Sequence, residues 1–405
     1  MHVFYKTSIA FILLSLCSCI GKQQQPKLRL DKLDQHISTE KKKSKKNGRN
    51  QYQHLCHTAL LSFYNKEYDN AAKYFELAHS WSENHYTKST SKIALAKIIN
   101  EKVSTFRGHY LERFQFRLLA GINYLCLSQK EAALIEFRRL SREIRLSEDP
   151  FGEKRSKESL QHYSALTGLF FALLKRPNEG KSDLKFSFNL NPETFPRYLK
   201  KEVKQWVVSK NSKPMKAFNK HGLIDNGKGI KLFIKLTNPR NTLVSKKISL
   251  TMFNYLPIIQ TEVGDHKNYN EIEEILLGTL GKRIISISFP TPKTSSKMNN
   301  NDSDFLDFNK LYNKSWQLQK NRLIKTSIIR ICLKLIAANA ASKAIENKID
   351  NNWGQLLSNI GRTLVWKTEK ADLRVINYLP SLVNVKWEWV EEGNESIQVN
   401  WNDVF

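Results

Sequence analysis

The sequence has few cysteines, and none of them has the spacing of a redox or zinc motif. Five cysteines occur among the 405 residues. No CxxC pair is present, which argues against a zinc ribbon and against a thioredoxin-like dithiol. Cys17 and Cys19 lie in a leader-like segment, which leaves Cys56, Cys126 and Cys332 as the other thiols. Three thiols cannot all pair within one chain, so we expect at least one to be free or linked to another molecule.

Catalytic motifs are also lacking. The sequence contains no GxSxG, HExxH or SxxK element with supporting partners. Residues 278–282 hold two glycines and a lysine, but only two residues separate the glycines, whereas a phosphate-binding loop has four. His54, Cys56 and His57 do not converge on a metal, because adjacent side chains on a helix point about 100° apart. We therefore predict that the protein is not an enzyme and has no metal, cofactor or small-molecule substrate.

Acidic residues are scarce relative to basic ones. The chain has 65 Lys and Arg against 38 Asp and Glu, a formal net charge of +27. Such a balance is typical of proteins that bind nucleic acid, anionic lipid or another polyanion. Compositional drift toward lysine and asparagine is an equally good explanation. Export of the chain, for which the N-terminus argues, disfavours nucleic acid as a partner.

The N-terminus lacks an apolar run long enough to span a membrane, which takes about 20 residues. It has instead the features of a signal peptide, predicted to cover residues 1–18. Lys6 supplies a positive charge, residues 9–16 are apolar, and Leu16 stands three places before Cys19. This pattern resembles a bacterial lipobox, which implies cleavage before Cys19 and a diacylglycerol thioether on its sulfur. An ordinary secretory signal with two incidental cysteines is the alternative.

Residues 19–50 are predicted to form a disordered basic tether. Ten Lys and Arg against three acids occur between residues 20 and 50, with a lysine run at 41–46. Few apolar residues are available to bury. The lysines are expected either to lie on anionic headgroups, at about 1 kcal/mol each, or to be solvated.

Residues 51–208 are predicted to form an all-helical array of tetratricopeptide-like repeats. The clearest repeat is 114–140, two antiparallel helices joined by a turn at 127–129. Small residues at helix crossings, with aromatic residues beside them, are typical of such repeats. The predicted packing residues are Ala59, Ala71, Phe75, Gly121, Tyr124, Ala133, Phe137, Gly168, Phe171 and Gly180.

The first helix of each repeat is expected to line the concave face of the array. The lining positions are uncharged: Cys56, Leu60, Phe63, Tyr64, Leu118, Ile122, Leu125, Cys126, Ala165, Leu169, Ala172 and Leu173. An open apolar groove would be prone to aggregation, so we expect it to be filled. The apolar helix predicted at 93–103 is the favoured occupant, and an apolar partner is the alternative.

Residues 209–229 are predicted to be a linker, and 230–405 an antiparallel, strand-rich domain with one long helix. Apolar residues alternate at 230–236 and again at 383–389, which is typical of strands with one covered face. A turn at Gly393-Asn394 indicates a closing hairpin between 383–389 and 397–401. A short strand is expected at 284–289 and helices at 270–280 and 319–348. The predicted fold class is therefore α+β, a helical array followed by an antiparallel sheet.

The chain resembles a family of uncharacterised bacterial lipoproteins with tetratricopeptide-like repeats and a strand-rich C-terminal half. The resemblance covers roughly residues 52–400, and an Asn- and Ser-rich insert at 298–307 departs from it. The residues that carry it are 108–113, 120–125 and 133–140, and less closely 328–344, 352–357, 371–374 and 378–380. The resemblance implies no catalytic residues.

Together these features predict an envelope lipoprotein, held to a membrane by its N-terminal lipid, that acts as a protein-interaction scaffold in cell-envelope assembly. The envelope protein that it would bind is not identified by the sequence. The alternative is a binder of an anionic envelope polymer or lipid, such as lipopolysaccharide or acidic glycan, through its basic surface. Ile20, which follows the lipid-bearing cysteine, lacks the aspartate that retains lipoproteins in the inner membrane, so the outer membrane is favoured.

The lipid attachment can be tested directly. Replacing the predicted nucleophile, Cys19→Ala, is expected to abolish incorporation of a labelled fatty acid in cells. Persistent labelling of that variant would refute the lipobox assignment.

Overall fold

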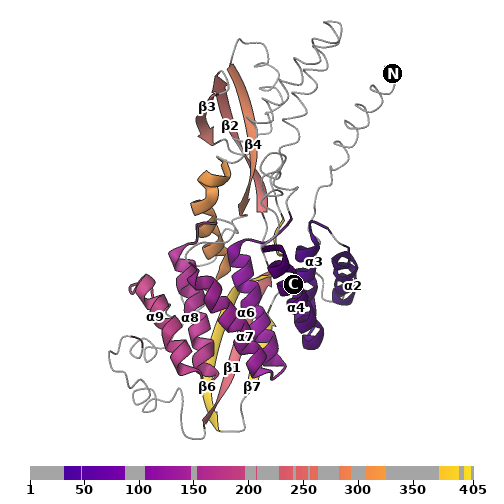
Figure 1. The fold of residues 1–405 in the computed structure, drawn as a ribbon, viewed down its shortest axis with the longest axis vertical. Helices are drawn as coiled ribbons and strands as arrows, with labels where there is room; N and C mark the ends of the chain where they lie inside the picture. The colour runs from indigo at the N-terminus through magenta and orange to yellow at the C-terminus, as the bar shows by residue number, and fades with distance from the viewer. Residues whose placement is uncertain are drawn as a thin grey trace.

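The helices of the N-terminal half pair into three antiparallel hairpins (Figure 1). In this computed structural model α3 (Gln51–Tyr64) pairs with α4 (Tyr68–Tyr86), α6 (Tyr110–Cys126) with α7 (Lys130–Arg145), and α8 (Lys157–Leu173) with α9 (Pro177–Leu190). A further helix, α2 (Leu33–Ser44), packs on α3. The structure describes residues 32–46, 48–86, 105–146, 153–196, 207, 228–239, 243–253, 256–262, 282–292, 306–324, 374–391 and 396–402.

All three hairpins turn through the same local geometry. The middle turn residues Lys66, Ser128 and Lys175 have φ of 61°, 58° and 60°. In each turn the middle N–H donates to the carbonyl three residues back, and the next N–H donates to the carbonyl five residues back. These two bonds define the Schellman motif, which satisfies carbonyls that the helix end leaves free. The turn predicted at 127–129 is confirmed.

Small residues lie where the helices of a hairpin cross. A Cβ placed on Gly121 of α6 would lie 2.7 Å from Phe137 Cζ of α7. A Cβ on Gly168 of α8 would lie 2.9 Å from the Gly180 carbonyl oxygen of α9. Phe137 continues the packing into the next hairpin by stacking on Phe170 at 4.7 Å. The other predicted packing residues are buried, except half-buried Tyr124: Ala59, Ala71, Phe75, Ala133 and Phe171.

A mixed four-stranded sheet lies against the helices. Its order is β5 (Leu306–Asp307), β6 (Pro380–Glu391), β1 (Lys228–Pro239) and β7 (Ser396–Asn402). Figure 1 shows β1, β6 and β7 behind the hairpins α6–α7 and α8–α9, and residues of both layers belong to one hydrophobic cluster. Ile234 and Leu236 are buried whereas Lys235 between them is exposed. One face of the sheet is therefore covered, as the alternation predicted.

The expected hairpin near the C-terminus is wrong. β1 lies between β6 and β7, pairing antiparallel with β6 and parallel with β7, so Ile234 faces Val385 on one side and Val399 on the other. The sheet is mixed rather than antiparallel. A turn signal specifies that the chain reverses, but it does not specify which strand the next one pairs with. Here β1 is the neighbour of both β6 and β7, so these two strands do not pair with each other.

A second, antiparallel sheet has β2 (Leu243–Phe253) between β3 (Leu256–Glu262) and β4 (Lys282–Pro292). Figure 1 shows it extending away from the helices. The strand expected at 284–289 runs on through two prolines, which an edge strand tolerates. Residues 308–324 are helical, so the helix expected from 319 begins earlier. The helix expected at 270–280, and the remainder of the longer one, lie outside the described residues.

The tether expected at 19–50 is wrong in its C-terminal part. Residues 33–44 form α2, which buries Leu33 and Ile37 against the next helix. These two apolar residues are four apart and share one helix face, which the lysine-rich composition obscured. Cys19 and the predicted signal peptide lie outside the described residues, and so does most of the linker expected at 209–229. No helix among the described residues is both long and apolar enough to cross a membrane.

A buried irregular segment, residues 374–379, joins the two halves; we call it the strap. Its backbone is hydrogen-bonded by side chains that precede it by more than 260 residues. Gln53 and Tyr64 of α3 donate to the carbonyls of Val375 and Tyr378, at 2.7 and 2.6 Å. The N–H groups of Ile376 and Asn377 donate to Glu112 of α6 and His57 of α3. Because buried backbone groups need partners, these side chains specify the position of the strap.

The predicted concave positions are buried or half-buried. In the described structure the strap and the four-stranded sheet lie on this side of the helices, and the two halves share one core. The groove is thus occupied by this chain, as the absence of charge indicated. The helix favoured as its occupant, at 93–103, lies outside the described residues.

The crossing at Gly121 can be tested by adding one methyl group. Gly121→Ala forces Phe137 to move, and we expect a loss of about 1–3 kcal/mol in the free energy of unfolding, seen as a lower melting temperature. Gly48→Ala is the control, because its nearest neighbour would lie 3.9 Å away. Equal melting temperatures for the two variants would contradict the close packing.

Candidate functional site

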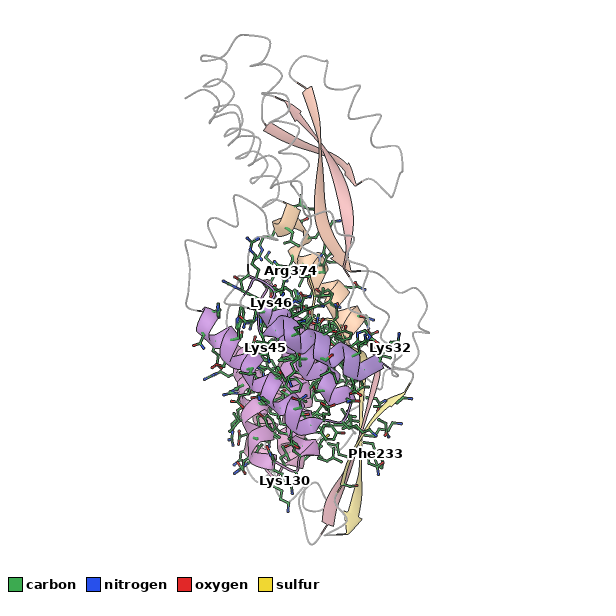
Figure 2. The ribbon with its side chains drawn as sticks, turned by 90° about the vertical axis from the view of Figure 1, so that its right-hand side faces the viewer. Lys32, Lys45, Lys46, Lys130, Phe233 and Arg374 are labelled. Atoms are coloured by element: carbon green, nitrogen blue, oxygen red, sulfur yellow. The ribbon has the colours of Figure 1, made fainter. Side chains whose placement is uncertain are left out.

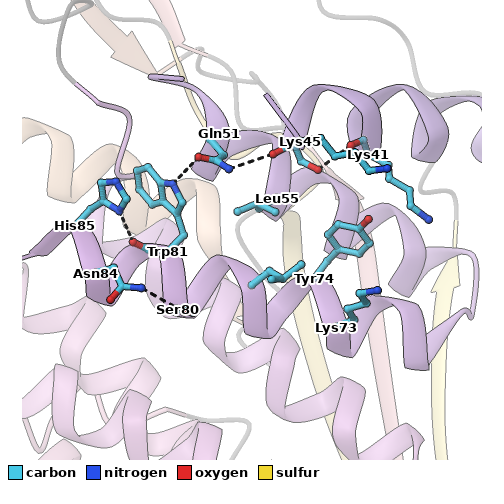
Figure 3. A pocket seen from close by; sticks show the side chains of 12 residues that line it. Lys41, Lys45, Gln51, Leu55, Lys73, Tyr74, Ser80, Trp81, Asn84 and His85 are labelled. Atoms are coloured by element: carbon cyan, nitrogen blue, oxygen red, sulfur yellow. Dashed lines mark hydrogen bonds between the residues drawn. The ribbon is translucent and has the colours of Figure 1, made fainter. Parts of the chain in front are cut away.

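A pocket opens between α2 and α4, with α3 as its base (Figure 3). Its volume is about 510 Å³, within the range of small-molecule sites. The lining residues come from all three helices: Lys41, Ser44, Lys45, Gln51, Leu55, Lys73, Tyr74, Leu77, Ser80, Trp81, Asn84 and His85.

The pocket is cationic at its edges and apolar at its base. Lys41 and Lys45 stand one turn apart on α2, and Lys73 faces them from α4. The lining includes no Asp or Glu. Leu55 and Leu77 supply apolar surface, and Leu77 is 44% exposed although its side chain is large and apolar. This arrangement suits an anion that also carries an apolar part.

Trp81 forms one end of the pocket, and its contacts connect the helices that form the pocket walls. Its ring lies between those of Tyr52, at 5.4 Å, and His85, at 3.9 Å. Its indole N–H donates to Gln51 Oε1 at 2.9 Å, and Gln51 Nε2 donates to the Ser44 carbonyl of α2 at 3.3 Å. Figure 3 shows this chain of bonds from α4 through α3 to α2. The walls are therefore connected by specific contacts as well as by apolar packing.

A cluster of Glu40, His54 and His57 fixes α2 on α3. Glu40 Oε2 lies 2.7 Å from His54 Nδ1 and 3.2 Å from His57 Nδ1, and Lys43 Nζ lies 2.9 Å from the other carboxylate oxygen. Although burial opposes ionisation, hydrogen bonds from the two histidines hold the pKa of the Glu40 carboxyl well below its usual range. Burial lowers the pKa of His57.

These three side chains are close enough to be tested as a metal site. Two ligands on tetrahedral zinc stand about 3.3 Å apart at bond lengths of about 2.0–2.1 Å, whereas Glu40 and His54 are 2.7 Å apart, a hydrogen-bond length. His57 Nε2 also accepts the Asn377 N–H at 3.0 Å, so its Nδ1 carries the proton that Glu40 accepts. The geometry is that of a hydrogen-bonded ion cluster, and we assign no metal to it.

A second set of buried charges lies between α4, α6 and α7. Arg113 and Arg117 donate to the two oxygens of Glu143 at 3.1 and 2.8 Å. Glu136 lies 3.0 Å from His79 and is also near Arg117. Their burial makes the loss of one partner costly, and the network fixes how the helices align. It opens onto no described pocket, so we read it as structural.

Three further groups, the Glu112 carboxyl and the thiols of Cys56 and half-buried Cys126, have raised pKa values and no reactive partner. Burial raises the pKa of the Glu112 carboxyl to about 8, although two backbone N–H groups donate to it. Burial raises the pKa of the Cys56 thiol well above its ordinary value and that of Cys126 to about 11. Both cysteines are free. A thiol with a raised pKa is a poor nucleophile, so these cysteines are packing residues.

None of the predicted repeat-packing residues lines the pocket, because they lie in the helix crossings. The sequence showed the lysines of α2 only as a run of charge, and it did not single out Lys73 or Trp81. The available signal was the spacing of Leu33, Ile37 and Glu40, which repeats at three and four residues and marks a helix with one buried face.

The cluster at His57 predicts a loss of stability in acid. His57 is neutral in the fold, where its pKa is lowered from the ordinary histidine value of 6.5. Its contribution to the free energy of unfolding is therefore fully present above pH 6.5. That contribution is lost as the pH falls from 6.5 toward the pKa of His57 in the folded protein. Glu40 acts in the same direction at lower pH. On going from about pH 7 to about pH 5, His57→Asn should lose about 1 kcal/mol less than wild type.

Denaturant unfolding at the two pH values measures this difference. His36→Asn is the control, since His36 is a half-exposed histidine of α2 that is not part of the cluster. Other buried histidines also destabilise the fold in acid, among them His109 with a pKa of about 3 and His162 with one of about 4. These histidines are present in wild type and in both variants, so the test is the difference in acid destabilisation between the variants and wild type. An equal acid loss in His57→Asn and wild type would exclude the cluster as its source.

Known proteins do not assign this site a function. The resemblance to envelope lipoproteins rests on the residues quoted for it and remains a prediction. No protein-family model matches the chain, and no curated protein and no solved structure is similar to it.

Proposed function

We propose that this chain is a lipid-anchored protein of the bacterial cell envelope whose helical half binds an anionic ligand in the pocket between α2 and α4. The observation that carries this proposal is the pocket lining: lysines from two helices, an apolar base and no acidic residue. Of the two functions that the sequence predicted, this one is the binder of an anionic envelope polymer or lipid.

The charges of α2 support the proposal. Its acidic residues are engaged elsewhere: Glu40 with His54 and His57, and Asp34 with the Asn65 side chain at 2.9 Å. Lys41 and Lys45 are exposed at the pocket. The two acidic side chains of α2 are therefore bonded away from the pocket lining, and Lys41 and Lys45 remain at the pocket.

The location of α2 also supports it. Cys19, the proposed lipid attachment, precedes Leu33 by about 14 residues, which reach no more than about 50 Å when fully extended. The first described helix is thus held near the membrane, at the outer membrane if Ile20 directs sorting as we expect. Lys32 precedes the helix and Lys45 follows it (Figure 2), and Lys41, Lys42 and Lys43 lie in its last turn, so its positive charge is concentrated at the C-terminal end.

The scaffold function remains a second proposal. It is favoured by the three hairpins, which share the Schellman turn and the small-residue crossings of a tetratricopeptide-like array. The sheet and strap occupy the concave side, so a protein partner would bind the outer helices α4, α7 and α9. Ile135 of α7 is 49% exposed and would be part of that surface.

Anion binding can be tested with pyrenetetrasulfonate, a fluorescent aromatic polyanion. With the full-length lipidated protein in neutral detergent micelles, fluorescence anisotropy measures its affinity. Replacing the three pocket lysines together (Lys41→Gln, Lys45→Gln, Lys73→Gln) should weaken binding about a hundredfold, at about 1 kcal/mol for each charge lost. Raising the salt from about 50 to about 300 mM should weaken wild-type binding as well.

The control removes the same charge from another surface. Lys154, Lys157 and Lys185 are exposed and line no part of the pocket, and their replacement by glutamine should leave most of the affinity. If the two triple variants bind equally well, the probe reads net charge alone, and the pocket is not an anion site.

A further inference from the structure

We infer that the pocket between α2 and α4 holds the phosphate headgroup of a phospholipid of the membrane to which the chain is anchored. This inference rests on the proposed function and names its ligand. It assigns the lysines to the phosphate and the apolar base to the first part of the acyl chains.

The positions of the lysines favour a single compact anion. Lys41 and Lys45 line the pocket from α2 and Lys73 from α4, so positive charge lies on two walls of one pocket. A long polyanion is better served by a linear stripe of charge than by a pocket of about 510 Å³. A phosphate offers several acceptor oxygens to lysines that arrive from different directions.

The apolar base favours a lipid over a water-soluble phosphate. Leu55 and Tyr74 line the pocket beneath the lysines, and Leu77 is 44% exposed there. Exposed apolar surface of this kind is stabilised when an acyl chain covers it, whereas a sugar phosphate leaves it in water. The combination of lysines above leucines is that of a protein surface bound to an anionic membrane.

The anchor favours a lipid as well. A ligand in the same membrane as the lipid on Cys19 is present at high effective concentration, because the connection to α2 is only about 14 residues long and spans at most about 50 Å. The pocket would then hold the folded part of the chain against the membrane, as a second contact beside the covalent lipid.

Competition experiments test the inference. The full-length lipidated protein in neutral detergent micelles is loaded with pyrenetetrasulfonate, and the bound probe is displaced by phosphatidylglycerol in the micelles, phosphatidylcholine in the micelles, or soluble glycerol phosphate. We expect phosphatidylglycerol to displace the probe at about a tenfold lower concentration than glycerol phosphate. Phosphatidylcholine, whose headgroup carries no net charge, should not displace it.

A matched pair of variants separates the apolar base from general charge. Leu77→Asn should weaken displacement by phosphatidylglycerol about tenfold, since the acyl chain loses its contact. Ile135→Asn replaces a similarly exposed aliphatic residue of α7, 49% exposed, outside the pocket and should have no effect. Equal effects of the two substitutions would overturn the acyl contact.

The outcomes also separate this inference from the proposed function. If glycerol phosphate competes as well as phosphatidylglycerol does, the pocket is a soluble-phosphate site, so the inference is wrong and the proposed function stands. If the probe binds the triple-lysine variant as tightly as wild type, both are wrong. If phosphatidylcholine displaces the probe as well as phosphatidylglycerol does, the site does not select anionic lipid and the inference is again overturned.

Discussion

The burial of the strap is the constraint on which the rest of the structure depends. Residues 374–379 pass through the core without regular secondary structure, so their N–H and C=O groups need acceptors and donors from elsewhere. α3 and α6 supply them through Gln53, His57, Tyr64 and Glu112. The concave side of the helices is thereby covered by the chain itself, and the binding function has to be sought on another surface.

His57 connects that core to the candidate site. One of its ring nitrogens accepts the Asn377 N–H of the strap, and the other lies 3.2 Å from Glu40 of α2. α2 forms one wall of the pocket, so the wall is fixed by the same residue that fixes the strap. The Glu40 carboxylate is bonded inside this cluster, whereas Lys41 and Lys45 line the pocket. A single helix, α2, thus both packs on α3 and supplies two lysines to the pocket.

The helical hairpins show how local chemistry and tertiary contact combine. Each turn is closed by two hydrogen bonds within a six-residue stretch, so it needs no long-range partner. The crossings do need one: Gly121 is required because Phe137 occupies the space where its side chain would be. Local bonds therefore set the lengths of the hairpins, and small residues set how closely their helices approach.

The hairpin at 114–140 and the period-two strands with one covered face could be predicted from the residues alone, because both depend on the periodicity of neighbouring residues. Apolar positions without charge on the first helices also indicated that the groove is filled. The tertiary structure alone decided that β1 lies between β6 and β7, since strand order depends on contacts between distant segments. The existence of the pocket also depends on the tertiary structure. Lys41 and Lys73 are 32 positions apart, and only the docking of α2 on α3 brings them to one cavity.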